Sequence, residues 1–354
     1  MLVEIILENI FALNYTECRK IHQRRTHMKR IISVAPRMSK IIEADMPVIN
    51  ENEILIKLKY VGVCMSEHYG WSQAKEGMAF GHEPLGVVEA IGENVTEFSI
   101  GDIISGVWGS DLPGGGGMMQ YAKANVKNGS AWIFKLPVGI REVDYLLEPL
   151  ACMMSAVSKV KCSMPGSTVC VVGAGYMGCG AISLLRLRGC YVIAVDPIKE
   201  CRDNAIKYGA SEAYTPDEMW ERINNGFVGY DAVMEWGETN ESLDLAANLT
   251  KQCGQLCIGA YHTGEKRYVN MQLLNVRAIE CLSTHPRERE LSIIGAKNAI
   301  KLLSDGRWGY QNIPTKVYPM SRFDQAQAEL ETKFATHMKA VIDMSGDEFE
   351  PYVI

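Results

Sequence analysis

Residues 167–197 read STVCVVGAGYMGCGAISLLRLRGCYVIAVDP, and this stretch decides the fold of half the chain. It begins with the apolar run of a buried strand, turns at glycines, continues as a helix and returns as a second apolar strand. Its glycines form the pattern G-x-G-x-x-G at Gly173, Gly175 and Gly178. A glycine turn between a strand and a helix, followed by another strand, predicts a dinucleotide-binding unit.

The glycines of this turn have separate physical tasks. Gly173 permits the tight turn, Gly175 lets the backbone approach a pyrophosphate, and Gly178 lets the helix pack closely on the strand. The N-terminus of the helix presents unpaired N–H groups and the positive end of its dipole to a phosphate. We therefore expect cofactor contacts at Gly173, Gly175, Tyr176, Met177 and Gly178.

Asp196 ends the second strand, about 20 residues beyond the last glycine. Its carboxylate would accept hydrogen bonds from ribose hydroxyls and repel a 2′-phosphate, so we expect NAD(H) rather than NADP. Arg202 is expected to stack on the adenine or to bind phosphate. The alternative interpretation is a glycine turn that holds no nucleotide.

Composition sets outer limits on the function. The chain has 354 residues, 47% hydrophobic residues and a formal net charge of −6. Its length favours two domains, since single cores stop growing near about 250–300 residues. Mild acidity gives no electrostatic reason to expect nucleic acid or a membrane as partner, and no apolar run reaches the roughly 18 residues of a membrane helix. The odd number of cysteines, 11, without a disulfide framework favours a cytoplasmic location.

Beyond residue 197 apolar strands alternate with helices, which predicts a doubly wound parallel α/β sheet of the Rossmann type. The expected strands are 230–236, 254–261 and 279–284, and the expected helices are 199–210 and 242–254. Residues 28–110 have short strands and turns, which predict a β-rich, partly barrel-like domain. A long helix at 289–305 and a strand at 338–344 follow the parallel sheet.

We therefore expect four segments: an N-terminal extension (1–27), a β-rich catalytic domain (28–152), the dinucleotide-binding domain (153–286) and a return to the catalytic domain (287–354). The extension is interpreted as the product of an upstream start codon. Its alternative is an added helix that packs on the fold.

Four residues of the first half have metal-ligand chemistry: Cys64, His82, Glu83 and Glu148. One thiolate, one imidazole and carboxylates suit a zinc site that has three protein ligands and an open position. Each residue alone has a simpler explanation. A cysteine at a strand end is more often part of the core, and a glutamate near a domain junction is usually a surface or hinge residue.

The surrounding strings are VGVCMSEHYGW (61–71), FGHEPLGVVEAIG (80–92) and LLEPLACMM (146–154). Through them, residues 28–344 resemble the zinc-dependent medium-chain dehydrogenase/reductase family, nearest in pattern to its sorbitol-like polyol dehydrogenases and threonine dehydrogenases. The resemblance implies a GroES-like catalytic domain. It also implies that Cys64, His82, Glu83 and Glu148 surround one catalytic zinc ion, with Glu83 as a transient ligand.

The chain departs from the family pattern beside Cys64. Glu67 stands where the family usually has an aspartate that orients the histidine ligand. Tyr69 stands where a histidine commonly relays protons, with His68 one residue earlier, so the identity of the relay stays open. Ser66 matches the family's hydroxyl that receives the substrate proton, and its alternative role is a turn hydrogen bond. The stretch between Cys64 and His82 is short, which predicts a more open pocket wall.

Many relatives carry a lobe in which four closely spaced cysteines hold a structural zinc ion. The equivalent stretch, residues 106–126, contains no cysteine. We therefore expect no structural zinc, and a glycine-rich loop at 109–118 in place of the lobe.

Ligands of open α/β sheets bind at the carboxyl ends of the strands. The expected nicotinamide contacts are Gly237, Ile258, Gly259, Ala260 and Ser283. His262 and His285 follow two of these strand ends and are candidates for substrate contact, although loop histidines are more often structural. Arg287 and Arg289 are candidates for contact with a polyhydroxylated or anionic substrate, or else solvated charges at a helix start.

The leading hypothesis is an NAD- and zinc-dependent dehydrogenase that oxidises a sugar, polyol or cyclitol. An edge strand at 279–284 favours a homodimer or homotetramer. One alternative is a zinc-free NAD(P)H-dependent enone or quinone reductase of the same superfamily, which Cys64, His82 and Asp196 disfavour. Another is a non-catalytic dinucleotide-binding protein, which would have no need of the ligand set.

Overall fold

The computed structural model describes residues 26–107, 117–126, 132–161, 165–285, 288–332 and 336–354. The expected N-terminal extension therefore lies almost entirely outside the described residues, as do Arg287 and most of the glycine-rich loop. The first described strand begins at His27, one residue before the expected start of the β-rich domain at residue 28.

The predicted doubly wound parallel sheet is confirmed. Its six strands run in the order β10-β9-β8-β11-β12-β13, and every neighbouring pair is parallel. Their bounds are β8 (Thr168–Val172), β9 (Tyr191–Val195), β10 (Glu212–Tyr214), β11 (Tyr230–Glu235), β12 (Thr250–Ile258) and β13 (Glu280–Ser283). The strand order reverses between β8 and β11, which is where Rossmann sheets bind dinucleotides. The strand expected at the sheet edge, β13, lies there.

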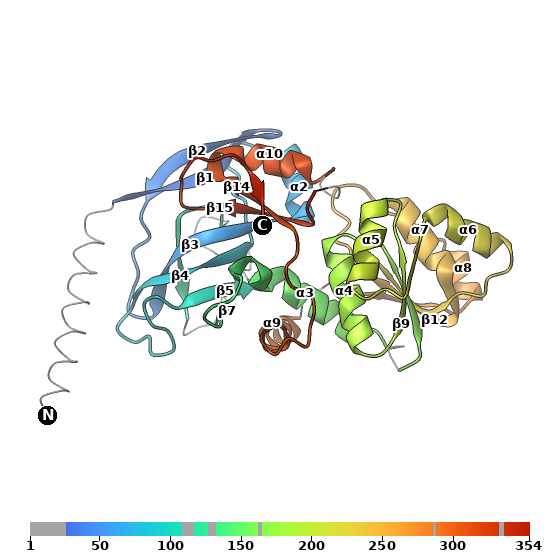
Figure 1. Cartoon of the computed structure of the whole chain (residues 1–354). Helices are drawn as coiled ribbons and strands as arrows, with labels where there is room; N and C mark the ends of the chain where they lie inside the picture. Colours follow the sequence, from blue (N-terminus) through green and yellow to red (C-terminus); the bar gives the residue numbers. More distant parts are fainter. Residues whose placement is uncertain (1–25, 108–116, 127–131, 162–164, 286–287, 333–335) are drawn as a thin grey trace, which may run out of the picture.

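Helices cover both faces of this sheet (Figure 1). They are α4 (Tyr176–Leu187), α5 (Lys199–Lys207), α6 (Pro216–Asn224), α7 (Asn240–Leu249) and α8 (Met271–Val276). Alternation along β8 explains the two layers. Val169 and Val171 share a core with α4 and α5, whereas Cys170 and Val172 share another with α6, α7 and α8. Capping boxes at Thr215 and Thr239 begin α6 and α7.

The predicted boundaries of one helix and of the strand after it were wrong, since the strand expected over 254–261 is β12, Thr250–Ile258. The helix expected over 242–254 ends at Leu249, and β12 begins at once with Thr250. Thr250 is fully buried and β-branched, and its hydroxyl donates to the carbonyl of Ala246 at 2.8 Å. That contact closes the helix while Thr250 already pairs with Tyr230 of β11. Strand pairing thus overrides the helical pattern of the segment.

The second sheet draws its eight strands from both ends of the described chain. Its order is β16-β14-β15-β3-β4-β5-β7, with β6 paired to β3. The bounds are β3 (Glu53–Val63), β4 (Glu83–Ile91), β5 (Ile103–Val107), β6 (Tyr121–Asn125), β7 (Trp132–Lys135), β14 (Thr315–Pro319), β15 (Lys339–Asp343) and β16 (Tyr352–Val353). A two-stranded ribbon, β1 (His27–Ala35) and β2 (Met38–Asp45), stands beside it. This β-rich half includes the predicted C-terminal return.

Four helices and two short 3₁₀ turns complete the β-rich half and its junction with the parallel sheet. They are α2 (Met65–Ser72), α3 (Leu147–Ser158), α9 (Arg289–Ser304), α10 (Phe323–Glu329), η1 (Glu142–Tyr145) and η2 (Met320–Arg322). Figure 1 shows α3 between the two halves. Its buried residues Leu150 and Met153 share one core with α4 and α9, so the junction is packed. Within the described ranges, no helix combines the length and apolarity that a membrane crossing needs.

Gly178 offers a test of the glycine turn. A Cβ atom at this position would lie 1.9 Å from the carbonyl oxygen of Gly173, and α4 is held by its buried face. Gly178→Ala should therefore lower the free energy of unfolding by about 1–3 kcal/mol, measured by urea denaturation. Gly309→Ala is the control, because a Cβ there meets no atom within 4 Å. Equal stability of the two variants would contradict the close packing of the turn.

Candidate functional site

A cavity of about 270 Å³ lies between the two halves, and most of the predicted site residues line it. From the β-rich half and α3 these are Cys64, Ser66, His82, Glu83 and Glu148. From the parallel sheet they are Gly175, Tyr176, Met177, Gly178, Gly237, Gly259 and Ala260. The predicted metal ligands and the predicted cofactor contacts therefore face each other across one cavity.

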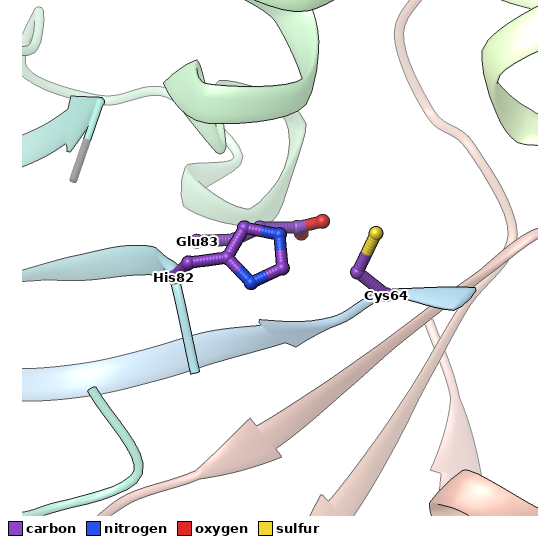
Figure 2. Close-up of side chains that lie close together, drawn as sticks. All are labelled: Cys64, His82 and Glu83. Atoms are coloured by element: carbon purple, nitrogen blue, oxygen red, sulfur yellow. The ribbon is translucent and has the colours of Figure 1, made fainter. Parts of the chain in front are cut away.

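Cys64, His82 and Glu83 form a tight group of potential metal ligands (Figure 2). Their ligand atoms all lie within 4.8 Å of one another. The register of β3 with β4 explains the group, since Gly62 pairs with Glu83. Cys64 lies just beyond the end of β3, and His82 just before the start of β4. A thiolate, an imidazole and a carboxylate at this spacing are the donor set of a zinc site.

Glu67 orients His82. Its Oε1 lies 2.9 Å from the Nδ1 of His82 and also accepts the backbone N–H of Gly81 at 2.6 Å. Nε2 is thereby the ring nitrogen left for a metal. Burial lowers the pKa of His82, but the charge of Glu67 and hydrogen bonds with Cys64 and Glu67 raise it well above its ordinary value. The glutamate, although longer than the family's aspartate, reaches the same ring.

Lys339 was missed at the sequence level. It begins β15, and its Nζ lies 2.7 Å from Oε1 and 2.5 Å from Oε2 of Glu83. Burial lowers the pKa of Lys339, yet the neighbouring Glu83 carboxylate raises it overall. Its Nζ also lies 5.0 Å from the ring centre of Tyr176. A lysine directly before the apolar run AVI of the string MKAVIDM was the available signal.

The Glu83 carboxylate occupies the space beside Gly62 that the Cβ of any other residue would fill. A Cβ atom on Gly62 would lie 1.8 Å from Oε2 of Glu83. The side chain of Glu83 is 1% exposed, so Lys339 is its main compensation. Glu83 thus already has a cationic partner, and a further carboxylate on the cavity wall is Glu148 of α3.

Glu148 and Cys152 stand one turn apart on α3 and face the same cavity. The Cys152 thiol donates to Oε1 of Glu148 at 3.3 Å. Burial raises the pKa of Glu148. Glu148 thus lies at the cavity wall but outside the group of three whose ligand atoms are closest.

The side chains of Ser66 and His68, which follow Cys64, point in different directions. Ser66 lines the cavity, and its hydroxyl donates to the Cys64 sulfur at 3.3 Å. His68, however, lies against α10, with its ring nitrogens 3.0 Å from the Gln327 carbonyl and 2.9 Å from Glu331. The geometry thus argues against His68 as a relay, because its position in α2 directs the ring away from the cavity. The exposed Tyr69 packs beside Gly264, in the loop after β12.

The glycine turn has the geometry expected of it. Gly173 has a φ of +91°, and a Cβ there would lie 2.6 Å from the backbone nitrogen of Gly237. Asp196 is 7% exposed, and its carboxylate accepts the N–H groups of Ala174 at 2.8 Å and Ile198 at 2.9 Å. It therefore fastens the turn to the end of β9. A tight left-handed turn at Gly173 and an adjoining carboxylate suit a dinucleotide.

Three predicted cofactor contacts, Arg202, Ile258 and Ser283, do not line the cavity. Arg202 donates to the carbonyls of Asp196 at 2.8 Å and Pro197 at 2.9 Å, and so closes the end of β9. Ile258 and Ser283 are the last residues of β12 and β13, one step behind the cavity wall.

Of the loop candidates for substrate contact, His285 reaches the cavity. Its ring packs at a tilt against that of Tyr261, with centroids 4.8 Å apart, and both residues line the wall. His262 instead points to Glu235, with Nε2 2.8 Å from Oε2. Arg289 lies over the ring of Trp132, at 4.7 Å from its centroid.

Comparisons with known proteins agree with this architecture. Residues 50–137 match the family model described as Alcohol dehydrogenase GroES-like domain. The L-threonine 3-dehydrogenase of Bacillus licheniformis is 32% identical over 57% of this chain and 68% of that protein. D-arabinitol dehydrogenase 1 of Uromyces fabae is 24% identical over 82% of this chain and 90% of its own. The acetophenone reductase of Geotrichum candidum, solved with NAD, superposes with a TM-score of 0.76 over 92% and 99% of the two chains at 19% identity.

Glu67 provides a direct test of the metal-binding geometry. Glu67→Ala should weaken zinc binding by about 10- to 100-fold, because His82 loses the carboxylate that fixes its ring. Competition with a chromogenic chelator measures the affinity. Glu331→Ala is the matched control, since Glu331 binds a histidine that faces away from the cavity. Equal zinc affinity in both variants would refute the orienting role.

Proposed function

Because the chain belongs to the zinc-type medium-chain dehydrogenase/reductase family, we propose that it oxidises a sugar, polyol or cyclitol with NAD⁺ in a zinc-dependent reaction. As a member of this family the protein is an oxidoreductase. The observation that carries the proposal is the shared cavity, in which Cys64, His82 and Glu83 face the glycine turn of the parallel sheet.

The metal would be held by Cys64, His82 and Glu148, as one catalytic zinc ion per chain. Zinc in such a site supplies a Lewis acid for the oxygen of the alcohol or carbonyl substrate. Glu67 keeps the ring of His82 turned to the site. Lys339 forms an ion pair with Glu83. This carboxylate would therefore bind the metal only after its contact with the lysine is broken. No structural zinc is proposed.

The cofactor would lie along the opposite wall. The N-terminus of α4 would receive the pyrophosphate, and Asp196 the adenosine ribose. The nicotinamide would rest against Gly237, Gly259 and Ala260 and present one face to the metal ligands. Ser66 would take the proton of the alcohol, and its place on the cavity wall supports that role.

The substrate class is inferred from relatives and from the wall. Curated relatives are named for arabinitol, sorbitol and threonine, each of which carries at least one secondary hydroxyl group. Tyr261 and His285 would contact the substrate beyond the metal. We also propose that residues 28–152 and 287–354 form the catalytic domain and 153–286 the cofactor domain. The exposed edge strand β13 supports a homodimer or homotetramer. The described cysteines form no disulfide with one another, which supports a cytoplasmic location.

A spectrophotometric screen of NAD⁺ reduction tests the proposal. The panel contains polyols, sugars, inositols and amino alcohols. We expect activity with at least one polyol, loss of that activity on chelation and its return with added Zn²⁺. Full activity in metal-free protein would favour the zinc-free reductase, and silence across the panel would favour a non-catalytic role.

Asp196 should decide the choice between NAD and NADP. Asp196→Ala removes a charged hydrogen-bond acceptor of the ribose, worth about 1.5–3 kcal/mol, and the repulsion of a 2′-phosphate. The ratio of kcat/KM for NAD⁺ to that for NADP⁺ should fall at least about tenfold. Asp203→Ala is the control, because Asp203 is an exposed aspartate of α5 paired with Lys199. An unchanged ratio in Asp196→Ala would refute the assignment.

A further inference from the structure

We propose that Glu235 and His262 form a buried positioning pair that sets the affinity for the cofactor, by holding together the two loops against which the nicotinamide rests. The inference rests on the proposed function, because that function places the nicotinamide at Gly237 and Ala260. The pair itself lies behind the cavity wall and touches no cofactor.

Glu235 is the centre of the arrangement. It is the last residue of β11 and is 0% exposed. Its Oε1 accepts the backbone N–H groups of Gly237 and Glu238, each at 2.8 Å, and the hydroxyl of Ser242 at 2.7 Å. One carboxylate oxygen therefore shapes the whole turn between β11 and α7.

The other oxygen of Glu235 reaches the neighbouring loop. Oε2 lies 2.8 Å from Nε2 of His262, which follows β12. The second ring nitrogen, Nδ1, is buried and has no partner among the groups that the structure describes. The contact with Glu235 is thus what holds this side chain. It joins the loop that contains Gly237 to the loop that contains Ala260.

A second tie runs parallel to the first. The Glu238 carboxylate accepts the backbone N–H of Thr263 at 3.0 Å and its hydroxyl at 2.9 Å. Arg267 donates to the Glu238 carbonyl at 2.9 and 3.2 Å. The two loops are therefore connected at both sides of the wall.

The backbone shows that these side chains are needed. Glu238 has a φ of 63° and His262 a φ of 51°, in the left-handed region that favours glycine or asparagine. Larger residues stay in this region only where surrounding contacts fix them, and such residues concentrate at functional sites. Here the fixing contacts are Glu235 for His262 and Thr263 for Glu238.

When these two loops are already ordered before the cofactor binds, the affinity for the cofactor is higher, because binding then loses less conformational entropy. Trp236 transmits any shift, since a Cβ on Gly259 would lie 2.6 Å from its indole ring. Loss of the pair should loosen both loops and weaken NADH binding, while the metal ligands on the other side of the cavity stay in place.

Two substitutions of His262 separate the bond from the backbone strain. His262→Gly relieves the left-handed conformation but removes the hydrogen bond, whereas His262→Asn tolerates that conformation and keeps an N–H donor. NADH fluorescence titration of the zinc-loaded full chain should give a Kd about tenfold higher for His262→Gly and within about threefold of wild type for His262→Asn. The KM for NAD⁺ should rise in parallel, with zinc content unchanged.

Glu235→Gln completes a double-mutant cycle. If the pair acts as one unit, combining Glu235→Gln with His262→Gly should weaken NADH binding much less than the two separate losses together. If His262→Gly binds NADH as tightly as wild type, or if the two substitutions weaken NADH binding additively, the Glu235–His262 pair has no such role, and the proposed function is unaffected. Wild-type protein that binds no NADH would overturn the proposed function and with it the role of the wall.

Discussion

The site depends on the pairing of one strand, β3, with two of its neighbours, β4 and β15. Its register with β4 sets Gly62 opposite Glu83 and brings Cys64 beside His82. Its register with β15 sets Val63 opposite Ala340, next to Lys339. The ammonium and the carboxylate then compensate each other in a place where removing one partner costs about 3–5 kcal/mol. The antiparallel ladder thus gathers a thiol, an imidazole and a balanced ion pair around one point.

Much of the fold was predictable because its signals are local. The glycine turn, its helix and the strand ending in Asp196 are coded within about 30 residues, so pattern alone indicated them. The alternation of strands and helices gave the parallel sheet for the same reason. The metal ligands came from the strings around Cys64, His82 and Glu148, whose meaning rests on a family resemblance and not on their spacing alone.

The remainder depends on contacts between distant parts of the chain. Lys339 pairs with Glu83 across 256 positions, and no local pattern indicates its partner. His262 was a candidate for substrate contact, but its left-handed backbone turns the ring to Glu235. His68 faces α10 because side-chain direction within α2 is set by the helix. Thr250 ends α7 early because β11 is there to pair with it.

We propose that the β-rich half supplies a zinc centre and that the parallel sheet supplies the NAD wall of one reaction cavity. Metal titration tests it most directly. Metal-free protein is mixed with NAD⁺ and the best polyol, and the initial rate is followed as Zn²⁺ is added. The account predicts a rate that rises linearly and stops rising at one zinc ion per chain. A rate that is already maximal before zinc is added would contradict it.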